Sequence, residues 1–417
     1  MKRPKKKVAI IGAGISGLYL AWKISKKFNV TVFEKNNYFG GHSNTINVNL
    51  KKKIIPVDTG FIVFNKRNYP NLLQFFKMLN IKIKKSDMSF SLYLNKDNFY
   101  YSGNFSGIFA QKKNLISKNF WIMLFEIITF YLRVPLKIKK IKNSITLEEY
   151  LNKEGYSKYF KDRHIYPMAS AIWSTKRGVI NKMPLKSFIN FFNNHGLFKF
   201  FNRPSWYTVS GGSQNYIKEV LKKTSAKFIK NVKVIKIKKN NNKVEVFTNK
   251  SKAYFDYAVC ATHADETSEI LKEIDYKTSV LLEKFKYSKN KTYLHSDERL
   301  MPKNKKVWSS WNYVSFYKKG KENNCFSYWM NKLQNIDKKY PFFLSLNPPF
   351  KPNNIYYKTT YTHPIFTKKS LEITKKLEKV QGKNKIWFCG SYFYNGFHED
   401  AVNSSIKIAK LLNNEIS

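Results

Sequence analysis

The strongest constraint on the fold of this chain is a short apolar strand followed at once by a glycine turn. Residues 8–11 (Val-Ala-Ile-Ile) predict a buried strand. They lead into Gly12-Ala-Gly-Ile-Ser-Gly17, after which apolar residues recur at helical spacing. Residues 30–33 predict a second strand, which ends at Glu34. This order of strand, turn, helix, strand and acid is the βαβ unit that binds a dinucleotide in its crevice.

Each glycine of the turn has a separate physical purpose. Gly12 allows the tight turn, and Gly14 has no Cβ, so that a diphosphate can approach the backbone. Gly17 lets the helix pack closely against the sheet. The three positions together predict a phosphate site at the start of the first helix.

The remaining residues of this unit complete the predicted nucleotide site. The helix begins at Ile15 and Ser16, where free N–H groups and a partial positive charge favour an anion. Glu34 can accept hydrogen bonds from ribose hydroxyls, which disfavours a 2′-phosphate there, and the adjoining Lys35 is included in the site. A dinucleotide with a free ribose is the expected ligand.

Two further glycine motifs lie at opposite ends of the chain. Residues 40–45 read Gly-Gly-His-Ser-Asn-Thr, soon after the ribose acid. Residues 387–390 predict a strand that ends in glycine, and residues 396–402 (Gly-Phe-His-Glu-Asp-Ala-Val) begin a helix. With the first unit, these motifs resemble the flavoproteins of the amine oxidase and phytoene desaturase superfamily.

The whole set of motifs resembles a narrower bacterial group within that superfamily, the predicted NAD/FAD-binding, amine-oxidase-like oxidoreductases. One departure is Ala401, where that group is expected to have Gly. The other segments that carry the resemblance are residues 57–65, 69–72, 194–197, 209–213, 294–297, 308–313 and 363–364.

The resemblance implies FAD as the cofactor, with the closing helix directed at the pyrimidine edge of the flavin. His398 is the candidate catalytic residue at that edge, and a contribution from its backbone N–H alone is the alternative. Val232 is an alternative, equally spaced, to Val234 at the adenine. The cofactor-binding residues implied in this way are Gly41, His42, Ser43, Thr59, Gly60, Phe61, Ile62, Val234, Gly390, Ser391, His398, Glu399 and Ala401.

The expected fold is α/β, with a Rossmann-type FAD-binding domain interleaved with an α+β substrate domain, as in the amine oxidase-like two-domain flavoproteins. A β-hairpin over residues 232–247 and a buried strand over residues 257–261 predict the middle return to the first domain. The FAD-binding domain is expected at residues 1–65, 206–265 and 381–417, and the substrate-binding domain at residues 66–205 and 266–380.

The charge of the chain points away from nucleic acid. The formal net charge is +49, a field that suits nucleic acid or an anionic membrane surface. However, seven of the 76 basic residues are Arg, whereas base readers favour Arg for bidentate contacts. Lys, Asn, Ile, Phe and Tyr are abundant together, which indicates A/T-rich coding, and no nucleic-acid-binding motif is present.

Residues 120–136 predict a long apolar helix, interrupted by Glu126, Arg133 and Pro135 and followed by the basic stretch 137–142. An interfacial helix with a membrane-surface anchor and a core helix with a solvated Lys tail are both open interpretations. Three widely spaced cysteines suit a reducing compartment. We therefore expect a cytoplasmic protein, with peripheral contact to the inner membrane face as the alternative.

These expectations define an enzyme, a FAD-dependent oxidoreductase. It would dehydrogenate an apolar organic substrate, with a fatty-acyl lipid and lipid metabolism as the leading candidates, by hydride transfer to the flavin. An amine oxidase and a FAD-dependent isomerase without net redox change are the alternatives. The histidines form no H-E-x-x-H and no G-x-S-x-G is present, so we expect neither a metal site nor hydrolase chemistry.

Overall fold

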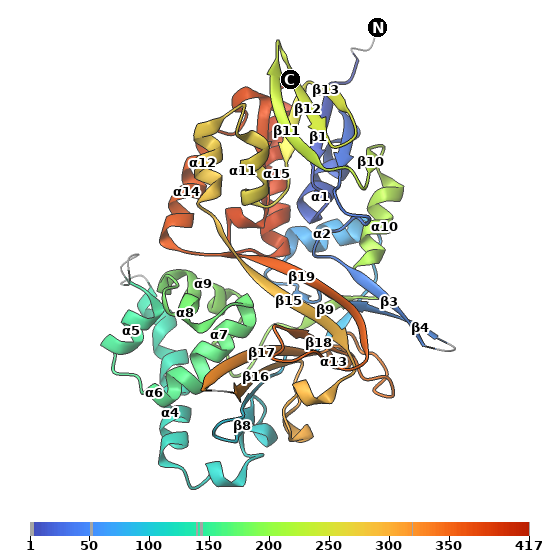
Figure 1. Ribbon diagram of the computed structural model, residues 1–417. Helices are drawn as coiled ribbons and strands as arrows, with labels where there is room; N and C mark the ends of the chain where they lie inside the picture. Colours follow the sequence, from blue (N-terminus) through green and yellow to red (C-terminus); the bar gives the residue numbers. More distant parts are fainter. Residues whose placement is uncertain (1–3, 51–52, 139–140, 142–144, 319, 417) are drawn as a thin grey trace.

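The computed structural model describes residues 4–50, 53–138, 141, 145–318 and 320–416. Five described strands form a parallel sheet in the order β10-β2-β1-β14-β20 (Figure 1). They come from the beginning, the middle and the end of the chain, so the α/β fold with returning segments is confirmed. Their bounds are β1 (Lys7–Ile11), β2 (Asn29–Phe33), β10 (Lys227–Ile229), β14 (Tyr257–Cys260) and β20 (Ile386–Phe388).

Both faces of this sheet are covered, which explains its continuous apolar strands. Val8 and Ile10 of β1 pack on the side of α1 (Ile15–Ile24) and α15 (His398–Asn414). Ala9 and Ile11 pack on the opposite side, against a three-stranded meander. A strand that is buried on both faces has no polar alternation. The meander consists of β11 (Val234–Asn240), β12 (Lys243–Thr248) and β13 (Lys252–Phe255), and its first two strands are the predicted hairpin.

A second sheet belongs to the other half of the molecule. Its seven described strands have the order β19-β15-β18-β17-β16-β7-β8, and its pairs are antiparallel except for β16 with β7. Figure 1 shows β15 and β19 crossing the space between the two halves. The bounds are β7 (Phe90–Leu94), β8 (Phe99–Ser102), β15 (Lys286–His295), β16 (Trp311–Lys318), β17 (Lys321–Trp329), β18 (Phe343–Leu346) and β19 (Ile355–Ile365).

A layer of helices packs beside the second sheet and shares its core. Phe130 and Phe188 from this layer belong to the same buried cluster as Leu294 and Leu344 from the sheet. The helices of the layer are α4 (Lys118–Lys137), α5 (Leu147–Lys153), α6 (Lys158–Phe160), α7 (Tyr166–Trp173), α8 (Arg177–Asn181) and α9 (Leu185–Asn194).

Short elements complete the structure. The strands among them are β3 (Thr45–Leu50), β4 (Lys53–Asp58), β5 (Phe64–Asn65), β6 (Ile83–Ser86) and β9 (Trp206–Val209). The helices are α2 (Pro70–Met78), α3 (Phe105–Ile108), α10 (Gln214–Lys223), α11 (Ala264–Leu271), α12 (Tyr276–Glu283), α13 (Met330–Leu333) and α14 (Lys368–Lys379).

One buried carboxylate connects the two halves. Asp58, at the end of β4, accepts hydrogen bonds from the backbone N–H of Ser213 (2.9 Å) and from Thr45 Oγ1 (2.5 Å). It also accepts one from Gln334 Nε2 (2.9 Å), which follows α13 in the second half. Burial raises the pKa of Asp58 to about 6. The residue thereby fixes the loop that follows it, residues 59–62, against both halves.

We expect Asp58→Ala to lower the free energy of unfolding by about 2–4 kcal/mol, because several buried donors lose their acceptor. Urea unfolding followed by circular dichroism measures this loss. Asp337→Ala is the control, since the exposed Asp337 side chain accepts from the backbone N–H of Lys339. Its effect should stay within about 0.5 kcal/mol. Equal effects of the two substitutions would contradict the role given to Asp58.

Candidate functional site

A cavity of about 1730 Å³ extends from the carboxyl ends of the parallel strands to the second sheet. Ile11 of β1 and Phe33 of β2 line it at one end, and Leu344 of β18 lines it at the other. The chain leaves β1 toward β2 on one side and later adds β14 on the other side, so β1 lies at the topological switch point. Ligands of open α/β sheets bind at this position.

The glycine turn forms the phosphate end of the cavity. A Cβ on Gly17 would lie 2.0 Å from the carbonyl oxygen of Gly12, so close packing requires glycine there. A Cβ on Gly14 would meet no heavy atom within 4 Å, because Gly14 faces the cavity. Gly14 is the N-cap of α1, and no side chain forms a capping hydrogen bond there. The open space and the free helix N-terminus fit a diphosphate.

The ribose and adenine end lies beside β2. Glu34 is buried and lines the cavity, and its carboxylate accepts hydrogen bonds from the backbone N–H groups of Ala13 (3.0 Å) and Asn36 (2.8 Å). Lys35 forms an ion pair with Glu266 of α11 across this end. Val234 and its alternative Val232 both line the cavity, so both fit the expected adenine contact.

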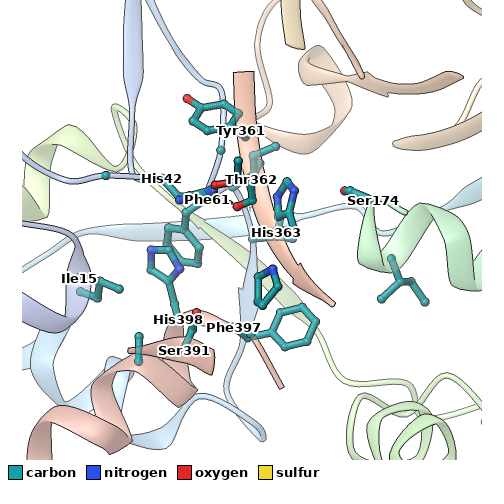
Figure 2. Close-up of a pocket in the computed structure, with 18 of the residues that line it drawn as sticks. Ile15, His42, Phe61, Ser174, Tyr361, Thr362, His363, Ser391, Phe397 and His398 are labelled. Carbon is teal, nitrogen blue, oxygen red and sulfur yellow. Dashed lines mark hydrogen bonds between the residues drawn. The ribbon is translucent and has the colours of Figure 1, made fainter. Parts of the chain in front are cut away.

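The flavin end expected from the sequence is formed by the loop after Asp58 and by the start of α15 (Figure 2). The backbone N–H of Phe61 donates to the carbonyl oxygen of His42 (2.7 Å). The Phe61 ring stacks on the His398 ring with a centroid distance of 3.7 Å and an interplanar angle of 12°. This stacking connects two segments that are far apart in the sequence and fixes the plane of the His398 imidazole.

Hydrogen bonds fix the tautomer of His398. Tyr216 donates its hydroxyl hydrogen to Ser43 Oγ (2.5 Å), and Ser43 Oγ lies 2.8 Å from His398 Nε2. Ser43 therefore donates to Nε2, which leaves the hydrogen of the neutral imidazole on Nδ1. Burial lowers the pKa of His398 to about 3, so the ring is uncharged near neutral pH.

Three more imidazoles line the cavity near this end. The His42 ring lies 5.4 Å from that of His363 and 5.8 Å from that of His263. Burial is the main cause that holds the pKa of His42 well below its usual range, and the neighbouring imidazoles lower it further. Burial also lowers the pKa of His363 to about 4. The wall that they form is polar but uncharged.

His263 was not predicted from the sequence. The usable signal was its position two residues after Ala261, at the carboxyl end of a strand of the nucleotide-binding sheet. Among the residues that the structure describes, no three His, Cys, Asp or Glu side chains form a group that could hold a metal ion.

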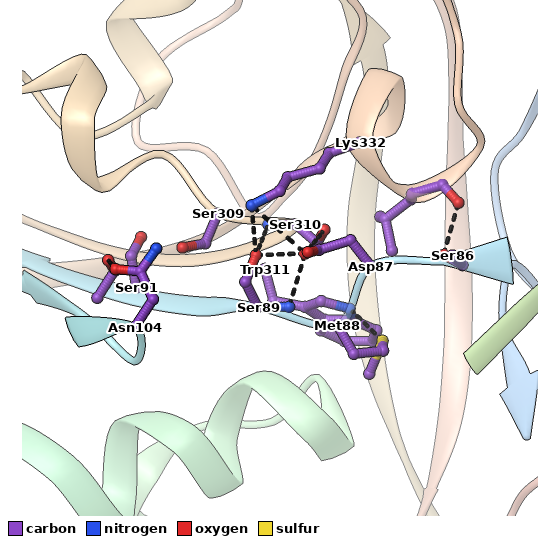
Figure 3. A network of polar contacts seen from close by, with 12 residues as sticks. Ser86, Asp87, Met88, Ser89, Ser91, Asn104, Ser309, Ser310, Trp311 and Lys332 are labelled. Carbon is purple, nitrogen blue, oxygen red and sulfur yellow. Dashed lines mark hydrogen bonds and ion pairs between the residues drawn. The ribbon is translucent and has the colours of Figure 1, made fainter. Parts of the chain in front are cut away.

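The far part of the cavity is largely apolar and aromatic. One wall is fixed by Asp87, which accepts from the backbone N–H of Ser89 (2.8 Å) and from Ser310 Oγ (2.6 Å) and pairs with Lys332 at 3.5 Å (Figure 3). The lining residues there include Met88, Phe90, Leu124, Ile127, Tyr131, Met168, Ile172, Phe191, Leu197, Trp206, Trp311, Tyr328 and Leu346.

His195 lies in the segment 194–197 that carries the resemblance, and its position near aromatic residues favoured a polar residue with its hydrogen bonds satisfied over a catalyst. The residue is 8% exposed, and its ring stacks on Phe191 with a centroid distance of 3.9 Å. Its Nδ1 donates to the carbonyl oxygen of Phe191 (2.9 Å), whereas Nε2 has no hydrogen-bond partner in the described part of the chain. Burial lowers the pKa of His195 to about 4. His195 thus lines the cavity as a neutral ring, and its acceptor Nε2 is buried without a hydrogen-bond partner in the described part of the chain.

The predicted site residues meet at this cavity with three exceptions. Gly17 and Ser43 lie behind the lining, where they position the first helix and His398. Glu399 does not line the cavity, and its carboxylate accepts from the backbone N–H groups of Asn71 (3.0 Å) and Leu72 (2.9 Å) at the start of α2. The predicted residues that line the cavity are Gly12, Gly14, Ile15, Ser16, Glu34, Lys35, Gly41, His42, Thr59, Gly60, Phe61, Ile62, Val234, Gly390, Ser391, His398 and Ala401.

Comparisons with known proteins agree with this geometry. Residues 10–79 match the NAD(P)-binding Rossmann-like domain family. No curated protein matches the sequence. A candidate protoporphyrinogen oxidase from Exiguobacterium sp. 255-15 has a similar structure, with a TM-score of 0.71 and 14% identity over 99% of each chain.

Two other solved structures are similar over nearly their whole length. The cyclohexylamine oxidase from Brevibacterium oxydans gives a TM-score of 0.69 at 12% identity, over 99% of this chain and 100% of the other. The CLA-producing fatty acid isomerase from P. acnes gives 0.68 at 12% identity, over 98% of each chain. The chain therefore shares its overall fold with these three proteins.

Two glycine substitutions separate cofactor binding from folding. Gly14 has φ −70° and ψ −178°, a conformation that any residue adopts. Gly14→Val should keep the melting temperature of the apoprotein and weaken binding of the expected dinucleotide at least about tenfold, because its methyl groups would occupy the candidate diphosphate space. Fluorescence titration of the apoprotein with FAD measures the affinity.

Gly17→Val is the matched variant, and it should destabilise the apoprotein by about 2 kcal/mol or more, because its Cβ meets a carbonyl oxygen. Differential scanning calorimetry compares the two proteins. Unchanged FAD affinity in the Gly14 variant would exclude the proposed diphosphate position.

Proposed function

We propose that this protein is a FAD-dependent oxidoreductase that dehydrogenates an apolar, fatty-acyl substrate. The observation that carries the proposal is the single cavity, which joins a diphosphate cradle at Gly14 to a long apolar chamber. This arrangement suits a two-part ligand at one end and an organic substrate at the other.

The geometry favours FAD over a nicotinamide cofactor. The N-termini of α1 and α15 reach the same cavity through Ile15 and His398. One terminus suits the diphosphate, and the other suits the electron-rich edge of a reduced ring. Bound FAD would supply the acceptor for a hydride from the substrate. The protein would contribute position, an uncharged wall and the exclusion of water.

The chemistry of the chamber favours an apolar acid as substrate. Its walls are mainly apolar, and the neutral histidines add no charge. Arg203 lines the cavity. Burial lowers the pKa of His164, and the positive charge of Arg203 lowers it further. Arg203 is exposed, so it places a cation at the solvent-accessible rim of the cavity, which suits a carboxylate head group. The net charge of +49 also disfavours the approach of a cationic amine.

His195 is the group that we place against the substrate. Its free Nε2 is an acceptor, held in place by the hydrogen bond of Nδ1 to Phe191 and by the neighbouring Trp206 ring at a centroid distance of 5.9 Å. A buried acceptor without a partner destabilises the protein, and a hydrogen-bond donor on a bound ligand would remove this penalty. Because Nε2 is itself buried, the ring would turn slightly toward the cavity to hold a polar hydrogen of the substrate.

A fatty-acyl isomerase without net redox change is the second candidate. The similar structure of a fatty acid isomerase favours it, because the apolar chamber suits the same substrate class. The mass of the product separates the two reactions, since dehydrogenation removes two hydrogens and isomerisation removes none.

Anaerobic mixing of the purified holoprotein with unsaturated and saturated fatty acids tests the proposal. We expect the yellow flavin absorbance to disappear with a fatty acid and to persist with cyclohexylamine. Bleaching by the amine alone would favour an amine oxidase and overturn the fatty-acyl assignment. A product of unchanged mass formed without bleaching of the enzyme at steady state would favour the isomerase.

Substitution of His195 tests its contact with the substrate. His195→Phe preserves the stacking on Phe191, and we expect kcat/KM to fall about tenfold or more because one hydrogen bond is lost. His195→Gln keeps a polar group and should recover part of the loss. Steady-state kinetics and flavin content measure the effect. Equal kinetics in His195→Phe and the wild type would exclude the contact.

A further inference from the structure

Helix α4 is apolar on two opposite sides. Its inner side packs in the core through Phe120, Met123 and Phe130. Its outer side has a stripe of exposed apolar residues at helical spacing, in which Phe125 is 66% and Leu136 is 83% exposed. A helix that is apolar all round is normally covered on all sides. We define the outer stripe as Trp121, Phe125, Ile128, Leu132 and Leu136.

The outer stripe continues onto the preceding segment. Phe109 contacts Trp121 at a ring-centroid distance of 6.2 Å and Phe105 at 5.3 Å. Trp121 Nε1 donates to the carbonyl oxygen of Leu115 (2.8 Å), next to Ile116, which is 90% exposed. The exposed apolar surface is thus contiguous. Contiguous patches of this kind mark interaction sites.

The cavity reaches this surface. Phe105, Ile128 and Phe200 each line the cavity and are each exposed at the molecular surface. The chamber therefore opens among the apolar residues. Figure 1 shows α4 in the half of the molecule away from β1 and α15. A substrate can pass from a partner at this surface into the cavity along apolar side chains.

Basic residues surround the apolar surface. Lys112, Lys113, Lys118 and Arg133 are exposed on its borders. Glu126 lies on the same helix, but its carboxylate accepts from the backbone N–H of Ser157 (2.6 Å) and from Ser157 Oγ (2.5 Å). Its carboxylate is thus hydrogen-bonded at the start of α6. Of the predicted basic tail, Lys139, Lys140 and Lys142 lie outside the described residues.

We propose that this face, α3 to α4, docks into the surface of an anionic lipid bilayer. Apolar residues with a basic border are the pattern of a helix that lies in the membrane interface. A second copy of the chain is a poorer partner, because symmetric contact would oppose the basic borders of both copies. The docking does not depend on the proposed reaction.

The helix is suited to lying on a bilayer rather than crossing it. It is long and apolar enough to span a membrane by length and composition. However, Phe130 and Tyr131 are buried in the core of the protein, and Leu124 and Ile127 line the cavity. A spanning position would expose this inner side and destroy the chamber. Insertion of the outer stripe leaves both intact.

Sedimentation of the full-length holoprotein with lipid vesicles tests the proposal. We expect binding to phosphatidylcholine vesicles that contain phosphatidylglycerol, and weaker binding to pure phosphatidylcholine or in high salt. The double variant Phe125→Gln/Leu132→Gln should bind at least about tenfold more weakly, because two inserted side chains are lost. Neither residue is part of the cavity lining, so flavin content should stay unchanged.

Matched variants control for general effects. Ile54→Gln/Leu371→Gln changes two exposed apolar residues on β4 and α14 and should bind vesicles like the wild type. Lys112→Glu/Lys118→Glu should weaken binding, whereas Lys250→Glu/Lys277→Glu, with the same change of net charge at other exposed positions, should weaken it less.

Equal loss in the matched pairs, or no vesicle binding by the wild type, would overturn the proposal. A dimer that is abolished by Phe125→Gln/Leu132→Gln, measured by analytical ultracentrifugation without lipid, would also overturn it in favour of self-association. Vesicle binding is measured without substrate, so its failure is distinguishable from a failure of fatty-acid oxidation.

Discussion

The contact between the first and the last helix holds the site together. Ser405 Oγ of α15 donates to the carbonyl oxygen of Ser16 in α1 (2.9 Å), 389 positions earlier in the chain. Small residues at the interface let the two helices lie close enough for both N-termini to reach one cavity. Two positive helix ends next to one ligand site would repel each other without an anion between them. The packing of the chain ends is thus also the construction of a cofactor site.

Local signals made the nucleotide half of the fold predictable. The glycine turn, the acid at Glu34 and the hairpin over residues 232–247 each depend on residues close in sequence. Strand β1, which leads into the glycine turn, is buried on both faces and therefore has an uninterrupted apolar sequence. The closing helix was predictable for the same reason, since its apolar residues follow the helical period.

Contacts across long sequence separations were not predictable. The resemblance placed Glu399 in the cofactor site, but no local signal indicated that its carboxylate accepts from the start of α2, more than 300 residues away. The free acceptor of His195 depends on which side chains fill the surrounding space. The exposure of the outer stripe of α4 was not predictable either, because the sequence shows that a residue is apolar but not whether another part of the protein covers it.

The shared carboxylate at Asp58 has a consequence for how ligands exchange. Because Ser213 from one half and Gln334 from the other both donate to it, a hinge between the halves would leave buried donors unpaired. Ligands would then enter and leave when exposed side chains at the opening of the cavity, such as Phe105 and Phe200, rotate. Exposed side chains rotate within picoseconds to nanoseconds. The rate of ligand exchange through this opening would then depend on the medium that surrounds the rim side chains, and not on a movement of the two halves.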